Sequence, residues 1–343
     1  MAIISVTAMA YSVLQTDAML RGLGFEPWGD WRTYANAVDR FFSGGALYAP
    51  AQLSGPYLMP RATIEVGYTY PPPSVLLLAP FAAGVPGLVA WLVVNAGILL
   101  TGVTAIIHRG FRTSLPLALA ISAFSLALYP PFTDGMAVGN INVGIAGLLA
   151  WCWVRRDGGR WIGAAAGISA VLKVYPGVLT AWDSRRRGWT AVRDAVFAGA
   201  FISLLTLPLV GIGLWIDFVH VLANAQPACW PTTTSLTCAL LPITGVTVAR
   251  VIALLVAVAA IGGALRVRSP FIAFALVTVA MLAPVADGWL HYWLFPYVVV
   301  VAGLAYLLGG RRESTKSISV STPSAGLDRP STEDRGAPHA VRS

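Results

Sequence analysis

The chain has 343 residues, of which 57% are hydrophobic and only 11% are charged. Soluble proteins carry about 25% charged residues, so this composition excludes a water-soluble enzyme, a disordered chain and a secreted disulfide scaffold. The formal net charge of +8 is typical of a membrane protein with basic cytoplasmic loops, and the absence of a basic face with interleaved aromatic residues excludes nucleic-acid binding.

Apolar segments follow one another along the chain, and several approach the ~20 residues that cross a bilayer. Segment 74–84 is too short to cross, and segment 161–182 is interrupted by Lys173 and Pro176. We expect these two to be re-entrant or broken helices. The sequence thus predicts an all-α polytopic membrane protein with about eight full transmembrane helices, at 2–20, 88–107, 114–129, 141–154, 194–212, 248–265, 270–286 and 289–308.

The basic residues predict the orientation of these helices. With the N-terminus inside, most of them fall in cytoplasmic loops, which is the usual bias, and the outer ones are Arg21, Arg32, Arg40, Arg61 and Arg250. We therefore expect a cell-membrane protein with both termini in the cytoplasm. The outer face then carries a long first loop (21–73), the stretch 129–140, the loop 213–247 and the corner 285–291. Residues 1–310 are expected to form one membrane domain and residues 311–343 a disordered cytoplasmic tail.

The first outer loop contains an amphipathic pattern directly after Asp30. Apolar residues recur at helical spacing from Trp31 to Phe42, which predicts a helix lying in the membrane interface. Asp30 stands at the start of this helix. It is either a helix N-cap or an acidic group that points into an external cavity.

Further polar and aromatic side chains recur in the outer stretches. Tyr68 and Tyr70 precede three consecutive prolines, which either give the next helix a stiff start or present two rings to a sugar or lipid headgroup. Asn140 and Asn142 bind either neighbouring helices or substrate hydroxyls. Asp134 is either a substrate contact or a solvated carboxylate.

Lys173 is the sharpest local anomaly, because a lysine within a membrane segment is costly. It binds an anionic ligand such as a lipid phosphate, or it is a snorkelling or paired lysine. Asp287 and His291 lie four residues apart in the last outer corner. His291 either contacts a phosphate or a carboxylate, or belongs to an interfacial aromatic belt.

The three cysteines form no zinc-ligand pattern. Cys229 and Cys238 lie in one outer loop, so we expect a disulfide between them in an oxidising exterior. Cys152 falls inside a span and is expected to be inert. Nucleotide-binding and hydrolase motifs are absent, and the cytoplasmic loops are too short for a nucleotide domain, so no cofactor and no metal are expected.

These features together resemble the family 87 glycosyltransferases, which are polytopic enzymes of the GT-C type. The resemblance covers roughly residues 25–310 and is carried by Asp30, Ala46-Leu47-Tyr48-Ala49-Pro50, Tyr70-Pro71-Pro72, Gly139-Asn140-Ile141-Asn142, Lys173 with Pro176, and His291. It implies that Asp30 is the catalytic base and that Lys173 and His291 face the phosphate of a donor lipid. The chain departs from the family at Asn140, where glutamine is usual, and at Tyr292, where a second histidine is common.

The resemblance implies transfer of a sugar, mannose first and arabinofuranose second, from a polyprenyl-phosphate donor to a glycan or glycolipid acceptor. A phosphate leaving group needs no nucleotide or metal, and inversion needs one carboxylate as base with cationic groups at the departing phosphate. Two alternatives remain open at this point. One is a transporter or flippase for a lipid-linked substrate that uses Lys173, although the chain has no internal repeat, and the other is a non-catalytic partner in an envelope-synthesis complex.

Overall fold

The computed structural model describes residues 2–22, 28–58, 67–157, 159–227, 229, 233–286 and 288–318. Up to residue 129 the elements are α1 (Ala2–Gly22), α2 (Gly29–Phe42), α3 (Pro50–Leu53), β1 (Tyr57–Leu58), α4 (Pro73–Leu78), the 3-10 helix η1 (Ala79–Phe81), α5 (Gly84–Phe111) and α6 (Leu115–Ala127). The remainder comprises α7 (Pro130–Val138), α8 (Asn142–Val154), α9 (Trp161–Leu172), η2 (Tyr175–Val178), α10 (Leu179–Arg187), α11 (Trp189–Asn224), β2 (Ala225–Gln226), α12 (Leu236–Thr244), α13 (Val246–Arg266), α14 (Pro270–Leu282), η3 (Leu290–Trp293) and α15 (Leu294–Ile318).

The predicted all-α polytopic fold is confirmed, with fewer long spans than expected. Within the described ranges, five helical stretches are long and apolar enough to cross a membrane, namely Ile3–Gly22, α5, α11, α13 and Leu290–Leu308. Helices α6 and α7 pass the same test only as a pair bent by 76°, because Pro130 and Pro131 follow the end of α6 and stop it. At 13 residues each, α8 and α14 are about 20 Å long, short of the ~30 Å hydrocarbon core.

Both segments expected to be broken are short or interrupted. Helix α4 has six residues and continues into η1. Helix α9 ends at Leu172, and Lys173 follows in an extended conformation (φ −157°, ψ 126°) before η2. Helix α11 also breaks, at Gly211, where φ is 68° and ψ is 162°. Because the helix resumes after Gly211 and continues to Asn224, the first part of the expected loop 213–247 is helical. The predicted tail 311–343 starts within α15, and residues 319–343 lie outside the described part of the chain.

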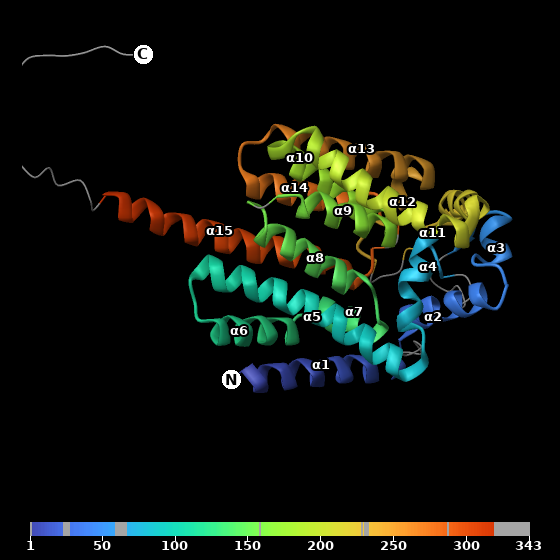
Figure 1. The fold of residues 1–343 in the computed structure, drawn as a ribbon, viewed down its shortest axis with the longest axis horizontal. Coiled ribbons are helices and arrows are strands. Elements are labelled where there is room, and N and C mark those ends of the chain that lie inside the picture. Colours follow the sequence, from blue (N-terminus) through green and yellow to red (C-terminus); the bar gives the residue numbers. More distant parts are fainter. Residues whose placement is uncertain are drawn as a thin grey trace, which may run out of the picture.

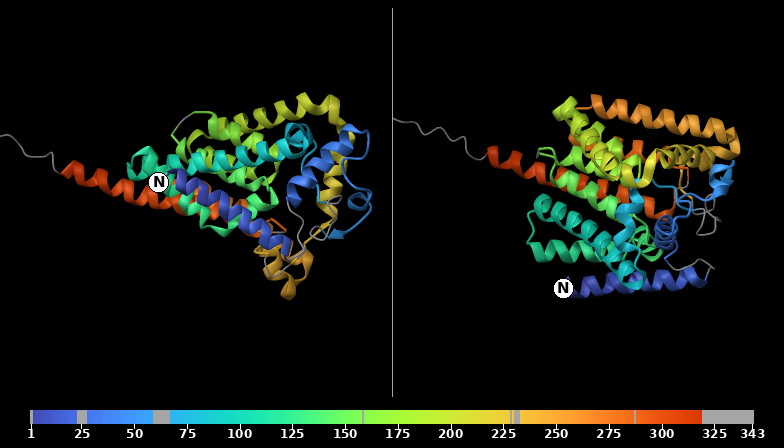
Figure 2. Two further views of the ribbon diagram at one scale, coloured as in Figure 1. Left: turned by 90° about the horizontal axis from the view of Figure 1, so that it is seen from below. Right: turned by 45° about the vertical axis from the view of Figure 1, so that its right-hand side comes forward.

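The surface of α13 shows how a membrane solvent sorts side chains. Its buried residues are small and recur every three or four positions, namely Ala249, Ala253, Ala257, Ala260 and Ala264. Most of its exposed residues are large and apolar, among them Val248, Val251, Leu254, Leu255, Val258 and Leu265. Small residues let neighbouring helices approach closely, whereas lipid accepts the large ones. Helix α13 thus turns an alanine face to α14, and the right-hand view of Figure 2 shows α13 and α1 on opposite sides of the bundle.

One end of the bundle gathers segments that the sequence places outside. Helices α2 and α3 lie at this end, and the N-terminus and the far half of α15 lie at the other (Figure 1). Strands β1 and β2 pair in parallel, with Tyr57 opposite Ala225, and the Tyr57 hydroxyl donates to the Val221 carbonyl over 3.0 Å. The first and third predicted outer loops are therefore joined.

A second set of polar contacts joins segments that the sequence places in the cytoplasm. Arg186 pairs with Asp157 at 3.0 Å, and Arg187 bridges Asp183, at 3.0 Å, and Asp194. These ion pairs hold the ends of α8 and α10 and the start of α11 together. Because no carboxylate of this cluster belongs to the predicted site, we treat it as structural.

Candidate active site

The start of α2 places Asp30 against Asn140, in the segment that precedes α8. The predicted amphipathic helix is confirmed as Gly29–Phe42, and its N-cap is Trp28 in a left-handed conformation (φ 57°) without a side-chain capping bond. The interpretation of Asp30 as the N-cap is therefore wrong. Asp30 is half-buried, and its Oδ2 accepts a hydrogen bond from Asn140 Nδ2 over 2.6 Å.

Two tryptophans fix this end of α2 against neighbouring segments, one against the end of α7 and one against η1. The Trp28 amide donates to the Ala137 carbonyl over 3.2 Å, and Trp31 Nε1 donates to the Phe81 carbonyl over 2.8 Å. Gly139 has a φ of +72°, and a Cβ there would lie 2.7 Å from Trp31 Cβ. Glycine is required at this position both for its backbone conformation and for the close approach that brings Asn140 to Asp30.

Asn140 and Asn142 extend the contact into the protein interior. Asn140 Oδ1 accepts from the Asn142 amide over 2.7 Å. Asn142 Oδ1 accepts from Lys173 Nζ over 3.0 Å and from the Tyr175 hydroxyl over 2.5 Å. An unbroken series of hydrogen bonds thus runs from Asp30 to Lys173. Asn142 Nδ2 is buried and has no hydrogen-bond partner among the described residues, so it remains a donor for a bound molecule.

The ammonium of Lys173 lies in a cage of aromatic rings. Its Nζ is 5.3 Å from the ring centroid of Tyr70, 5.4 Å from that of Tyr175 and 5.1 Å from that of Tyr292. Ring faces at this distance attract a cation. Across the described ranges Lys173 makes no salt bridge to a carboxylate. The cage and the Asn142 oxygen therefore hold a positive charge that no carboxylate of the described residues neutralises.

The two tyrosines of the Tyr-Pro-Pro stretch have different surroundings. Tyr70 contributes its ring to the cage, and its hydroxyl lies 2.9 Å from that of Tyr34. Tyr68 is completely buried, with its hydroxyl 2.6 Å from Ser74 Oγ. The prolines lead directly into α4, which begins at Pro73. Tyr70 therefore belongs to the site, whereas Tyr68 supports it from behind.

His291 lies beside the cage, in η3. Its side chain is buried, with Nδ1 3.1 Å from Asp134 Oδ2, and its ring stacks on Tyr292 at 5.3 Å between centroids. His291 Nε2 is buried and has no hydrogen-bond partner in the described part of the chain. This burial contradicts a place in an interfacial belt. Asp134 is thereby a partner of His291, and Asp287 lies outside the described residues.

The structure adds residues that the sequence analysis did not select. Tyr34, Tyr175 and Tyr292 complete the surroundings of Lys173 and Tyr70. Tyr175 and Tyr292 each adjoin a selected polar residue or proline, but tyrosines are common near membrane surfaces and their adjacency carried no specific signal. Only the meeting of three distant segments reveals the cage.

The assembled groups combine a base with anion-binding groups. Asp30 can accept a proton at one end of the hydrogen-bonded series. Lys173 supplies a positive charge at the other end and contacts Asn142, and His291 stacks on Tyr292 of the cage. Asn142 Nδ2 and His291 Nε2 have no hydrogen-bond partner among the described residues. Donors preset in a water-poor site stabilise a developing negative charge strongly. The arrangement therefore suits a reaction in which a hydroxyl is deprotonated and an anion departs.

Comparison with protein families gives one match. The family model for glycosyltransferase family 87 matches residues 68–290. The matched region contains Tyr70, Asn140, Asn142 and Lys173, begins after Asp30 and ends one residue before His291. No curated protein and no solved structure matches the chain.

Proposed function

The chain belongs to glycosyltransferase family 87 and is a multi-pass membrane glycosyltransferase, and we propose that it takes its sugar from a polyprenyl-phosphate donor. The sugar is mannose in this proposal, and the acceptor is a glycan or glycolipid. Family membership favours an enzyme over the transporter and the non-catalytic partner. The proposed donor has its phosphate at the membrane surface, where a bundle without a soluble domain can bind it.

The observation that carries the proposal is the hydrogen-bonded series from Asp30 to Lys173 through Asn140 and Asn142. It connects the two kinds of side chain that the reaction requires, a base and a group that stabilises the leaving phosphate. A carboxylate receives the proton of the acceptor hydroxyl, and cationic or N–H groups stabilise the phosphate that leaves. Three separate segments of the chain converge to supply them.

The proposed reaction is a single displacement with inversion. The acceptor oxygen forms a bond to the anomeric carbon while the bond from that carbon to the phosphate oxygen breaks. The electron pair of the broken bond stays on the phosphate, which Lys173 and His291 Nε2 stabilise. The hydroxyl proton passes to Asp30. One carboxylate is sufficient, because a direct displacement forms no covalent sugar–enzyme intermediate and so needs no second carboxylate as a nucleophile.

We further propose that the site faces the outside of the cell membrane and that both termini are cytoplasmic. The positive-inside bias of the loops supports this orientation. The disulfide between Cys229 and Cys238 supports it independently, because structural disulfides persist in oxidising compartments. Its loop contacts the segment that leads to His291, so the bond and the site share one end of the bundle.

The test uses membranes that carry the protein and polyprenyl-phosphate sugars labelled in mannose or arabinofuranose, with the envelope glycolipids of the same cells as acceptors. Asp30→Asn removes the base but keeps the size and the hydrogen bonding of the side chain. Asp39→Asn is the matched control, because Asp39 lies on the same helix and is exposed. We expect label transfer from the mannose donor, lost in Asp30→Asn and retained in Asp39→Asn.

Full transfer by Asp30→Asn would contradict the assigned base. Transfer from the arabinofuranose donor alone would correct the sugar. A folded protein that uses neither lipid donor would overturn the proposed donor class.

A further inference from the structure

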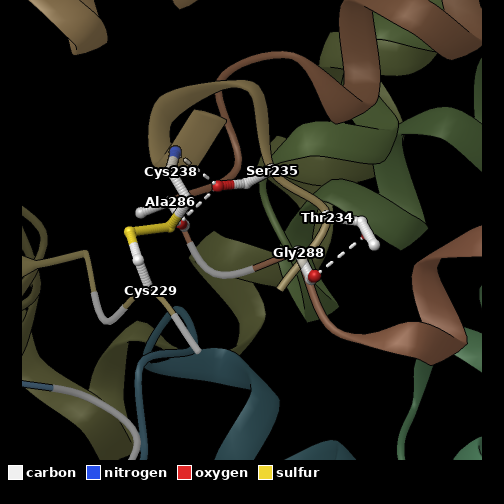
Figure 3. The surroundings of a disulfide bond; sticks show 6 residues. All are labelled: Cys229, Thr234, Ser235, Cys238, Ala286 and Gly288. Atoms are coloured by element: carbon white, nitrogen blue, oxygen red, sulfur yellow. Dashed lines mark hydrogen bonds between the residues drawn. A yellow bond between two sulfur atoms is a disulfide. The ribbon is translucent and has the colours of Figure 1, made fainter. Parts of the chain in front are cut away.

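The Cys229–Cys238 disulfide ties Cys229 to the first turn of α12 (Figure 3). Ser235 is the N-cap of α12, and its Oγ accepts a hydrogen bond from the Cys238 amide over 3.0 Å. An N-cap of this kind satisfies an amide that would otherwise lack a partner at the helix start. Cys238 is held by the disulfide through its side chain and by the Ser235 hydroxyl through its backbone amide.

The same loop binds the backbone that precedes η3. The Thr234 amide donates to the Gly288 carbonyl over 2.6 Å, and the Thr234 hydroxyl donates to the same carbonyl over 3.0 Å. Ser235 Oγ donates to the Ala286 carbonyl over 2.9 Å. Figure 3 shows the two carbonyls flanking the loop. One serine hydroxyl therefore joins the cap of α12 to the backbone beside the site.

Gly288 permits this contact by its size. A Cβ at this position would lie 2.9 Å from the Ser235 nitrogen and 3.2 Å from the Ser235 Cα. Both neighbours are backbone atoms that cannot rotate away. The close approach therefore fixes the distance between the loop and the segment as well as their hydrogen bonding.

His291 follows Gly288 by three residues. On its other side, η3 runs directly into α15, which is packed in the bundle. Helix α14 ends at Leu282, so the carbonyls of Ala286 and Gly288 have no helical partners and depend on the loop for their hydrogen bonds. The position of the backbone leading to His291 is thus set by α15 on one side and by the disulfide-closed loop on the other.

We infer that the disulfide-closed loop positions His291 for the phosphate of the donor, which makes Ser235, Thr234 and the Cys229–Cys238 bond positioning elements of the active site. The inference rests on the proposed function. None of these residues touches the reacting atoms. They act through the backbone at Ala286 and Gly288, and a shift of ~1 Å at a catalytic group can cost up to ~100-fold in rate.

The first experiment compares steady-state transfer by Ser235→Ala, by Cys229→Ser combined with Cys238→Ser, and by the unaltered protein. We expect each change to lower kcat/KM for the polyprenyl-phosphate mannose donor by about 10-fold, with the KM for the acceptor unchanged. Ser235→Thr, which keeps the hydroxyl, should retain activity. Ser269→Ala is the matched control, because Ser269 caps α14 in the same way, with its side chain accepting from the Ile272 amide, and has no contact with the loop.

The second experiment repeats the loop variants in a His291→Gln background. If the loop acts through His291, the variants cost less than about 2-fold there, since residues that act as a unit are not additive. A full 10-fold loss in that background, or an equal rise in both KM values, would overturn the inference.

A third measurement does not depend on activity. Hydrogen exchange of the backbone amides at 288–293 should be faster in Ser235→Ala and in the double cysteine variant than in the unaltered protein and in Ser269→Ala. Unchanged exchange would contradict the positioning role. Failure of the unaltered protein to transfer sugar would instead count against the proposed function, so the two ideas fail separately.

Discussion

Asn140 donates its side-chain N–H to the carboxylate of Asp30 over 2.6 Å, across a sequence separation of 110 residues. The bond joins α2 to the segment that precedes α8. It also places the carboxylate at one end of a hydrogen-bonded series whose other end is Lys173. The geometry of the site therefore depends on an amide as much as on the charged groups.

Replacing Asn140 tests this dependence. Asn140→Leu removes the donor to Asp30 and the acceptor for the Asn142 amide, so we expect kcat to fall by about 10-fold or more. Asn140→Gln keeps the amide, so it should retain most activity. The measurement is the rate of sugar transfer at saturating donor. Equal losses in the two variants would contradict a role for the amide.

Lys173 offers a direct test of anion stabilisation. Lys173→Met keeps the length of the side chain but removes the charge, and we expect kcat/KM for the lipid donor to fall by about 100-fold. Tyr175→Phe is the milder comparison, because it keeps the ring of the cage and loses only the hydrogen bond to Asn142, a loss of roughly 2- to 10-fold. We predict that Lys173→Met loses more activity than Tyr175→Phe. The reverse result would mean that the departing phosphate does not bind at Lys173.

Asp134 and His291 should behave as one unit. The two side chains are hydrogen-bonded through Nδ1, which leaves Nε2 as the ring nitrogen available to a ligand. Asp134→Ala alone should lower kcat/KM for the donor, and so should His291→Gln alone. The double variant should be scarcely worse than His291→Gln, because the aspartate acts through the histidine. His220→Gln, which alters an exposed histidine, serves as the control. Independent, additive losses would contradict the pairing.

The ion-pair cluster at the opposite end predicts a stability effect. Arg187→Met leaves the carboxylates of Asp183 and Asp194 without their bridging cation, and we expect the free energy of unfolding to fall by up to about 3 kcal/mol. Burial raises the pKa of the Asp183 carboxyl, and Arg187 opposes that rise. In the variant the pKa rises further, so the folded state takes up a proton more readily than the unfolded state.

The sign of the pH dependence follows from this uptake. A raised pKa in the folded state means that stability is gained as the pH falls and lost as it rises. We therefore expect the Tm of Arg187→Met to approach that of the unaltered protein at acid pH and to fall further below it as the pH rises toward the raised pKa of the Asp183 carboxyl. Thermal unfolding in detergent between pH 5 and 8 measures it, and a constant difference would contradict the assignment. The KM for the donor should not change.

Periodicity and composition predicted much of the fold. The pattern from Trp31 to Phe42 predicted α2, and Lys173 with Pro176 predicted the break after α9, because both depend on local chemistry. The apolar run 141–154 predicted the bounds of α8 within one residue. Helix α14 ends at Leu282, four residues before the end of the run expected at 270–286, because Pro284 cannot continue a helix.

The site was predictable only in part, for a similar reason. Asp30, Lys173 and His291 stood out because charged and polar groups are costly near a membrane. The cage around Lys173 joins Tyr70, Tyr175 and Tyr292, and no local pattern relates three tyrosines so far apart. Nor did the sequence indicate that Asn142 would contact Lys173, since that contact requires α8 and the end of α9 to meet.

On α13, the residues that pack against the bundle and the residues that face lipid occupy different positions. The buried positions of the helix are Ala249, Ala253, Ala257, Ala260 and Ala264. The large apolar residues that face lipid lie at other positions. Glutamine or threonine in place of Val251, Leu254, Leu255 and Val258 would change the solvent that this helix prefers and leave its packing intact. The lipid-facing residues of this helix can therefore be replaced by polar ones without changing the residues that pack, because the two sets of positions do not overlap.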